Sequence, residues 1–360
     1  MSALFYIFIL LCPFVIGIVQ MGDYFREGKC SWFYGFSALF IGQYFWRKVH
    51  PIFGVFVALC GFSTYLSYMH VNQVLDLLCI IFAGFMAIEW KKGSSFDKEL
   101  VLKGLAAAAV LNSMYGMLQV ADLDPFFRAA RDPYQPWIVP IGLLGHPTFL
   151  GSFVVPASAW LLFNKKYVYF MAANMVLFWC DSTMSWLALG ALLAVWFGHR
   201  FGRARMVISG IALISLFIIC GYLFPSQHLF SASGRVAIWA EAVRFIEQGP
   251  LMGYGLGNFK NMFMFFDVPD GPPFDKAHND YLQLLFELGW MGMAVVLLGL
   301  VRAAGNAWKY LAEPRTALYA AMLAALAINA FGNFPIRLLP HSLPILFAWL
   351  ELVKAPYSRP

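Results

Sequence analysis

Apolar runs of close to twenty residues recur from one end of this chain to the other. Each is near the roughly 20 residues that a helix needs to cross a bilayer. Only 12% of the 360 residues are charged, whereas 61% are hydrophobic. Because soluble domains carry about 25% charged residues, this chain has too little polar surface for a water-soluble globule. We therefore predict an all-α polytopic membrane protein.

The runs predict about twelve transmembrane helices in a single integral membrane domain, residues 1–360. The expected spans are 3–21, 31–46, 50–69, 71–90, 100–120, 139–163, 166–181, 183–198, 206–224, 279–301, 316–335 and 339–355. Asn112 and Gln119 weaken the apolar pattern of the fifth span. One larger loop is expected at 225–278, and a C-terminal portion of three helices at 279–355.

The positions of Lys and Arg predict the orientation in the membrane. With twelve spans, 16 of the 25 basic residues fall in one set of loops. Cytoplasmic loops are the ones enriched in Lys and Arg. Both termini are therefore expected in the cytoplasm, and the 225–278 loop in the periplasm. The same loops account for the net charge of +6, so no nucleic-acid partner is predicted. The six cysteines form no C-x-x-C pattern, and neither a metal site nor a cofactor is predicted.

The periplasmic loop is expected to contain an amphipathic helix. Ser233 is a suitable N-cap, and Gly249-Pro250 ends the helix after about Gln248. Apolar residues recur at steps of three and four and give a face that is expected to lie on the membrane surface. These residues are Val236, Trp239, Val243 and Ile246.

Two arginines of this helix have different surroundings in the sequence. Arg244 has Glu241 and Glu247 three residues away on either side, so it can pair locally. Arg235 lacks an acidic residue at those spacings and lies in the first turn, where the helix dipole disfavours a cation. A bound anion would explain this placement, because helix N-termini bind anions. The alternative is an arginine that contacts water or lipid headgroups.

His278 is expected in the first turn of the tenth span, with Asp275 as a possible N-cap. A helix N-terminus favours the neutral imidazole that a general base needs. Leu282, Leu285, Gly289 and Gly292 share its face and predict a groove for a helix or a lipid tail. The other face is a polar stripe of Asn279, Gln283, Glu287 and Trp290.

A glycine-rich segment, Gly253, Gly255 and Gly257, precedes this span. It has neither the dinucleotide-binding spacing nor the P-loop ending. Its glycines are expected to form a tight loop over the site.

Several segments resemble the O-antigen ligase and polymerase superfamily of bacterial lipid-linked glycan transferases. They are SGRVAIW, GPLMGYGLGNF, and His278-Asn279 followed after nine residues by Gly289-Trp290-Met291-Gly292. The segments GHPTFLG at 145–151 and NFPIRLLPH at 333–341 are similar to weaker family elements. Many members have a Ser-Arg pair at the start of the eighth span, where this chain has Asp181-Ser182-Thr183.

The resemblance implies a GT-C-type enzyme of the bacterial inner membrane with a periplasmic site. Its donor would be a glycan on undecaprenyl diphosphate, transferred without metal or nucleotide. Arg235 would hold the diphosphate, and His278 would activate the acceptor hydroxyl. Further substrate-contacting candidates are Asn279, Tyr281, His146, Arg337, Arg128 and Arg131. The last three are the candidates for a second diphosphate-binding arginine.

The acceptor is left open by the sequence. Lipid A–core would make the protein an O-antigen ligase in lipopolysaccharide or surface polysaccharide biosynthesis. Another lipid-linked repeat would make it a polymerase. A protein hydroxyl is disfavoured, because no additional soluble domain is apparent. A transporter or flippase of lipid-linked glycan is the alternative of a different class, but broken spans in two corresponding halves are not evident.

Overall fold

The computed structural model describes residues 95–124, 138–223, 233–266 and 276–353. Every regular element in these ranges is helical, which confirms the all-α class. The elements are α5 (Ser95–Val120), α6 (Pro147–Ala157), α7 (Ala159–Phe163), α8 (Tyr167–Asn174), η2 (Met175–Phe178), α9 (Thr183–Phe201), α10 (Arg203–Leu223), α11 (Ser233–Gln248), α12 (Phe259–Met262), η3 (Phe263–Phe265), α13 (Asp280–Lys309), α14 (Pro314–Asn329), η4 (Pro335–Arg337) and α15 (Leu339–Val353). The first four expected spans, with Arg128, Arg131 and Asp275, lie outside the described residues.

Two helices in the described ranges are long and apolar enough to cross a membrane, Lys98–Val120 and Asp280–Lys309. The expected span 139–163 is interrupted: its first part is irregular, and α6 and α7 follow, separated at Ser158. Likewise, the expected span 166–181 consists of α8 and the short helix η2. The number of twelve spans therefore stays a prediction.

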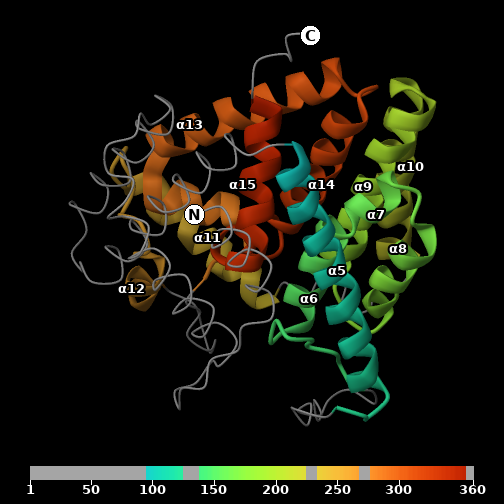
Figure 1. Ribbon diagram of the computed structural model, residues 1–360. Helices are drawn as coiled ribbons and strands as arrows, with labels where there is room; N and C mark the ends of the chain where they lie inside the picture. The colour runs from blue at the N-terminus through green and yellow to red at the C-terminus, as the bar shows by residue number, and fades with distance from the viewer. Residues whose placement is uncertain (1–94, 125–137, 224–232, 267–275, 354–360) are drawn as a thin grey trace, which may run out of the picture.

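Helix α9 lies between α10 and α14 in the described helices (Figure 1). It packs against α10 and α14, while α14 also contacts α15 and α6 (Figure 1). Small residues permit this close approach. A Cβ atom on Gly190 would lie 2.2 Å from Leu213 Cδ1, and one on Gly198 would lie 2.6 Å from Met206 Cβ. Larger residues at either position would force the Leu213 or Met206 side chain to move, so glycine favours the close α9–α10 contact.

Asn112 and Gln119, the polar residues that weaken the apolar pattern of α5, hold the irregular segment before α6. Both are fully buried. Gln119 Oε1 accepts hydrogen bonds from the backbone N–H groups of Ile141 and Gly142, at 2.9 and 2.8 Å. Asn112 Oδ1 accepts from the N–H of Leu143 at 3.2 Å. Non-helical backbone inside a membrane protein needs such partners. These bonds therefore hold the segment Ile141 to Leu143, which leads into α6.

We predict that Gln119→Leu destabilises the protein. Two buried backbone N–H groups would lose their acceptor, at a cost of about 1–3 kcal/mol each. The neighbouring Leu118 is exposed, so Leu118→Ala is the matched control and should change stability little. Thermal unfolding in detergent measures both. Equal melting temperatures for the two variants would contradict the assigned role of Gln119.

Candidate functional site

Helix α11 packs against the first part of α13. Ile238 and Ala242 of α11 are fully buried in an apolar cluster with Phe286 of α13. Trp239 Nε1 donates a hydrogen bond of 2.7 Å to the carbonyl oxygen of Ala277. Burial of this apolar surface fixes α11 beside the start of α13.

The expected membrane-facing side of α11 is divided in the structure. Trp239 and Ile246 pack against protein, whereas Val236 and Val243 are 55% and 42% exposed. The prediction of one continuous surface-lying face was therefore wrong. Spacing alone does not reveal that α13 supplies the partner for half of these residues.

Helix α13 is broken at Gly289, which has φ 64° and ψ −171°. A left-handed φ of this kind favours glycine. The break leaves carbonyl groups of the preceding turn available. The N–H groups of Tyr254 and Gly255 each donate a hydrogen bond of 3.0 Å, to the carbonyls of Phe286 and Glu287 respectively. The glycine-rich loop thus caps the break in place of the missing helical turn.

The contact between this loop and the break leaves no space for side chains. A Cβ atom on Gly289 would lie 2.2 Å from the carbonyl oxygen of Leu251. One on Gly253 would lie 2.4 Å from the backbone nitrogen of Gly289. Gly253, Gly255 and Gly257 all have positive φ. The loop therefore packs backbone to backbone against α13.

The groove expected along α13 is filled by protein. Leu282 and Leu285 pack in the apolar cluster that α11 and the glycine-rich loop complete. After the break, a Cβ atom on Gly292 would lie 2.4 Å from Leu288 Cβ. Of the two occupants expected for this face, a helix or a lipid tail, the structure shows the helix: α11 packs against it, together with the glycine-rich loop.

Two residues of the polar stripe of α13, Gln283 and Glu287, are buried and hydrogen-bonded, as their position requires, whereas Trp290 is 57% exposed. Glu287 accepts from Gln283 Nε2 at 2.8 Å, from the N–H of Gly257 at 2.9 Å and from Arg337 Nη2 at 2.6 Å. Arg337 Nε also lies 3.8 Å from Asp280 Oδ1. Two carboxylates thus hold the Arg337 guanidinium, which favours a structural role for this residue over diphosphate binding.

The sequence predicted His278 in the first turn of the helix, but in the structure it lies just before α13. The helix begins at Asp280 with Asn279 as its N-cap, whose side chain accepts from the N–H of Leu282 at 3.1 Å. His278 itself has a left-handed φ of 51°. Such strain costs about 1–3 kcal/mol and is concentrated at functional sites. Its ring packs edge-on against Phe334, with 5.1 Å between ring centroids.

Arg235 and Arg244 differ in the structure as their sequence contexts indicate. Arg244 Nη2 pairs with Glu241 Oε2 at 2.6 Å. Arg235 is half-buried, and its Nη1 donates to the carbonyl oxygen of Gly332 at 3.3 Å. No carboxylate of the described residues forms an ion pair with Arg235. Burial lowers the pKa of its guanidinium, because a charge removed from water is less stable.

Arg235 and His278 meet at the same short segment, Gly332 to Phe334. Arg235 contacts Gly332, and His278 contacts Phe334. Three bonds hold the segment and its flanks in place. Asp280 Oδ2 accepts from Ile336 N at 2.8 Å, Asp280 N donates to Ala330 O at 2.8 Å, and Asn333 Nδ2 donates to Ser152 Oγ at 3.4 Å. The two candidate catalytic side chains therefore share one rigid support.

Phe334 also connects His278 to His146. Its ring centroid lies 5.2 Å from that of Phe149, which lies 4.9 Å from that of His146. Sequence reasoning did not single out either phenylalanine as a site residue. Phe149 lies in the family-like segment GHPTFLG, and Phe334 lies in NFPIRLLPH. Their membership of these segments was the one sequence feature that could have indicated a place at the site.

The remaining described candidates have structural hydrogen bonds. Tyr281 Oη donates to the carbonyl of Ala327 at 2.9 Å, which ties α13 to α14. His146 is the N-cap of α6 and its Nδ1 accepts from the N–H of Thr148 at 3.3 Å. Tyr281 and His146 therefore have structural roles, in joining α13 to α14 and in capping α6, whether or not they also contact substrate.

Gly289→Ala is predicted to unseat the glycine-rich loop, because alanine disfavours the left-handed φ and its methyl group would meet the Leu251 carbonyl. Gly305 of the same helix has open space around its Cα, so Gly305→Ala is the matched control. Thermal unfolding should show a lower melting temperature for Gly289→Ala alone. Equal stability of both variants would contradict the backbone contact.

Comparison with known proteins identifies one family. A family model described as O-antigen ligase matches residues 168–297. The matched region runs from α8 into α13 and contains Arg235, the glycine-rich loop, His278 and Gly289. No curated protein matched the chain. The family and the apolar helices together indicate a membrane protein. The match confirms the resemblance inferred from the sequence for residues 168–297, which are similar to the O-antigen ligase family of glycan-transferring enzymes.

Proposed function

We propose that this protein transfers a glycan from undecaprenyl diphosphate to a hydroxyl group of lipid A–core. The observation that carries the proposal is the convergence of Arg235 and His278 on the segment Gly332 to Phe334. A cation and an imidazole held on one short segment are the groups that this transfer needs. One stabilises the leaving diphosphate, and the other accepts the proton of the attacking hydroxyl.

Arg235 is the proposed ligand of the donor diphosphate. It lies in the first turn of α11, whose N-terminal backbone N–H groups add to the attraction for an anion. The partly buried guanidinium is destabilised without an anion, and a diphosphate offsets that cost. As the bond between the anomeric carbon and the diphosphate oxygen breaks, negative charge grows on the leaving group. Arg235 stabilises this charge.

His278 is the proposed general base. Its imidazole takes the proton of the acceptor hydroxyl while the hydroxyl oxygen bonds to the anomeric carbon, and undecaprenyl diphosphate departs. General-base assistance of this kind contributes about 10²–10⁴-fold. Phe334 limits the positions of the ring by its edge-on contact. The strained backbone of His278 keeps the ring beside the segment Gly332 to Phe334, called here the support segment.

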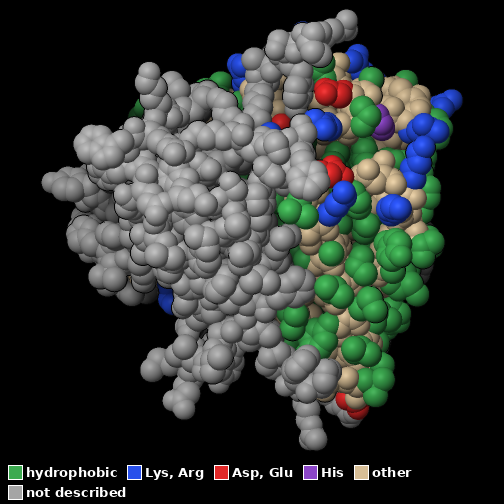
Figure 2. All heavy atoms as spheres, viewed as in Figure 1, with side chains coloured by type: hydrophobic (Ala, Val, Ile, Leu, Met, Phe, Trp, Pro, Cys, Tyr) green, Lys and Arg blue, Asp and Glu red, His purple; other side chains and the backbone are tan. Residues whose placement is uncertain are grey.

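The arrangement of charges supports a periplasmic site. Lys98 Nζ pairs with Glu351 Oε1 at 2.7 Å, so the start of α5 lies beside the end of α15. The segment that supports the site precedes α15, at its opposite end. Figure 2 shows Lys and Arg side chains at the upper end of the visible face and a hydrophobic surface below them. This pattern fits a cytoplasmic basic end and a site on the other side.

We propose that either Arg128 or Arg131 is the second arginine that binds the diphosphate. Arg337, the other candidate, is already paired with Glu287 and Asp280. Ser182, in the position of the family's Ser-Arg pair, instead caps α9 by accepting from the N–H of Ser185.

Purified protein with a lipid-linked glycan and three acceptors in separate reactions tests the proposed activity. The acceptors are lipid A–core, a second lipid-linked repeat and a protein with exposed hydroxyl groups. We expect product with lipid A–core. Product only with the second repeat would make the protein a polymerase. No product in any reaction, with folded protein, would contradict a transferase.

Arg235→Gln and His278→Ala are predicted to lose transfer by at least about 100-fold, because each removes a group that acts in the transition state. Arg244→Gln is the matched control for the same helix, and His199→Ala is the control for a histidine elsewhere. His199 Nδ1 bonds the Leu311 carbonyl, away from the support segment. Initial rates of product formation measure all four variants.

Melting temperatures show whether each variant is folded. A folded Arg235→Gln that keeps the rate of Arg244→Gln would remove Arg235 from the mechanism. The corresponding comparison between His278→Ala and His199→Ala decides the role of His278.

A further inference from the structure

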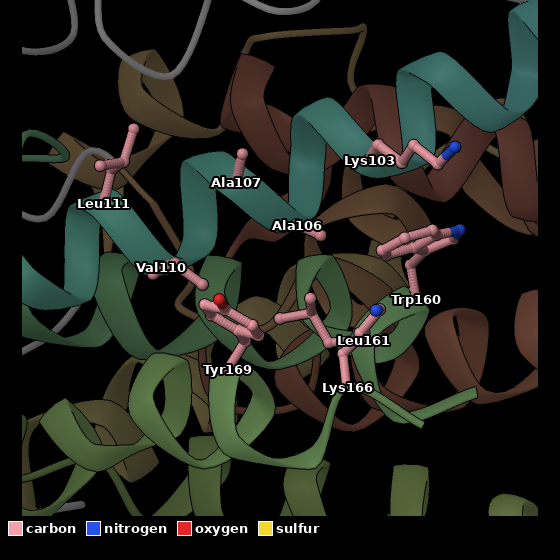
Figure 3. A pocket seen from close by; sticks show the side chains of 9 residues that line it. All are labelled: Lys103, Ala106, Ala107, Val110, Leu111, Trp160, Leu161, Lys166 and Tyr169. Atoms are coloured by element: carbon pink, nitrogen blue, oxygen red, sulfur yellow. The ribbon is translucent and has the colours of Figure 1, made fainter. Parts of the chain in front are cut away.

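A groove of about 400 Å³ lies between α5, α7 and α8, at the part of α5 that is remote from Gln119 and the glycan site (Figure 3). Its lining residues are Lys103, Ala106, Ala107, Val110, Leu111, Trp160, Leu161, Lys166 and Tyr169. Apart from the two lysines, the lining is almost entirely apolar. The groove therefore combines a hydrocarbon surface with a cationic end.

The apolar part of the groove continues into an exposed apolar face. Leu111 is 54% exposed and Val168 is 78% exposed. Methionines 171 and 175, and Phe178, extend this exposed face along α8 and η2. An uncovered surface of this kind is stable in contact with lipid and unfavourable in water.

The two lysines approach the groove from different elements and lie on either side of Trp160, away from Leu111. Figure 3 shows Lys103 on α5 and Lys166 just before α8, with Leu111 toward the other end. Lys103 Nζ lies 5.7 Å from the ring centroid of Trp160. The side-chain stems of lysine pack on apolar surface while the ammonium groups stay at the membrane boundary.

One carboxylate reduces the positive charge at this end. Glu99 Oε1 accepts a hydrogen bond of 2.8 Å from Trp160 Nε1 and lies 3.9 Å from Lys103 Nζ. Lys166 forms no ion pair with a carboxylate in the described part of the chain. Two ammonium groups against one carboxylate leave this end of the groove positively charged.

We propose that this groove binds one anionic glycerophospholipid of the surrounding bilayer. The phosphate lies between Lys103 and Lys166, and one acyl chain follows Ala107, Val110 and Leu111. The nine residues from Lys103 to Leu111 span roughly 12 Å of helix, enough for much of an acyl chain. A second copy of this chain would need an acidic group to meet the lysines, whereas an anionic lipid supplies both the charge and the apolar tail.

The site is separate from the proposed transfer reaction. Gln119 and the irregular segment that it holds lie at the other end of α5 from Lys103. The lipid would join α5 to α8 where their polar contacts are few. We therefore expect its binding to stabilise the bundle without contributing a reacting group.

Native mass spectrometry of the purified protein tests the site, with phosphatidylglycerol and phosphatidylcholine as probes. We expect preferential binding of phosphatidylglycerol. Lys103→Gln combined with Lys166→Gln should abolish this preference, since each lysine near a membrane surface strengthens anionic-lipid binding by about five-fold. Lys260→Gln combined with Lys309→Gln removes the same charge from exposed sites elsewhere and is the matched control.

Ala107→Phe provides a second, independent variant. Ala107 is exposed in the groove, so phenylalanine fills the acyl position without entering the core. It should weaken binding of phosphatidylglycerol while the melting temperature in phosphatidylcholine stays unchanged.

Three results would overturn the proposal. Equal binding of the two lipids by the unchanged protein would show that the lysines do not select an anion. Equal loss in the groove variant and in the Lys260/Lys309 control would assign the effect to overall charge. A dimer that Ala107→Phe dissociates would show that a second copy covers the groove.

Discussion

The break in α13 at Gly289 is the constraint on which the rest of the site depends. A continuous helix would use the carbonyls of Phe286 and Glu287 internally, but here they accept hydrogen bonds from the glycine-rich loop. The loop follows α11, so fastening it also fixes that helix against the first part of α13. Arg235 reaches the Gly332 carbonyl from this position. A backbone requirement at one glycine thus determines where a cation in another element is placed.

A buried ion pair, Glu287 with Arg337, also fixes the site by joining α13 to the C-terminal part of the chain. Glu287 receives hydrogen bonds from Gln283, Gly257 and Arg337, so one carboxylate joins α13, the glycine-rich loop and η4. Burying an ion pair is costly and contributes little net stability, but removing one partner is strongly destabilising. Such a pair specifies geometry more than it adds stability. Here it fixes the segment that carries both contacts of the proposed catalytic groups.

The sequence predicted the elements better than their junctions. Periodicity and caps located α11 with its observed bounds, and Gln283 and Glu287 of the polar stripe of α13 are satisfied in the interior as expected, whereas Trp290 is exposed. The face of α13 with Leu282 and Leu285 was expected to receive a helix or a lipid tail, and α11 packs there; the sequence pattern indicated close approach without deciding between the two. His278 was placed in a helix that begins two residues later, at Asp280. Phe334 escaped notice because its role arises only from contacts between segments distant in the chain.

The position of a bound diphosphate tests the central claim most directly. An electron cryomicroscopy structure with a non-transferable analogue of the lipid-linked donor would reveal it. We predict a phosphate oxygen within hydrogen-bond distance of Arg235, and the anomeric carbon on the side of His278. A diphosphate held by other residues, with Arg235 still bonded only to the Gly332 carbonyl, would contradict it.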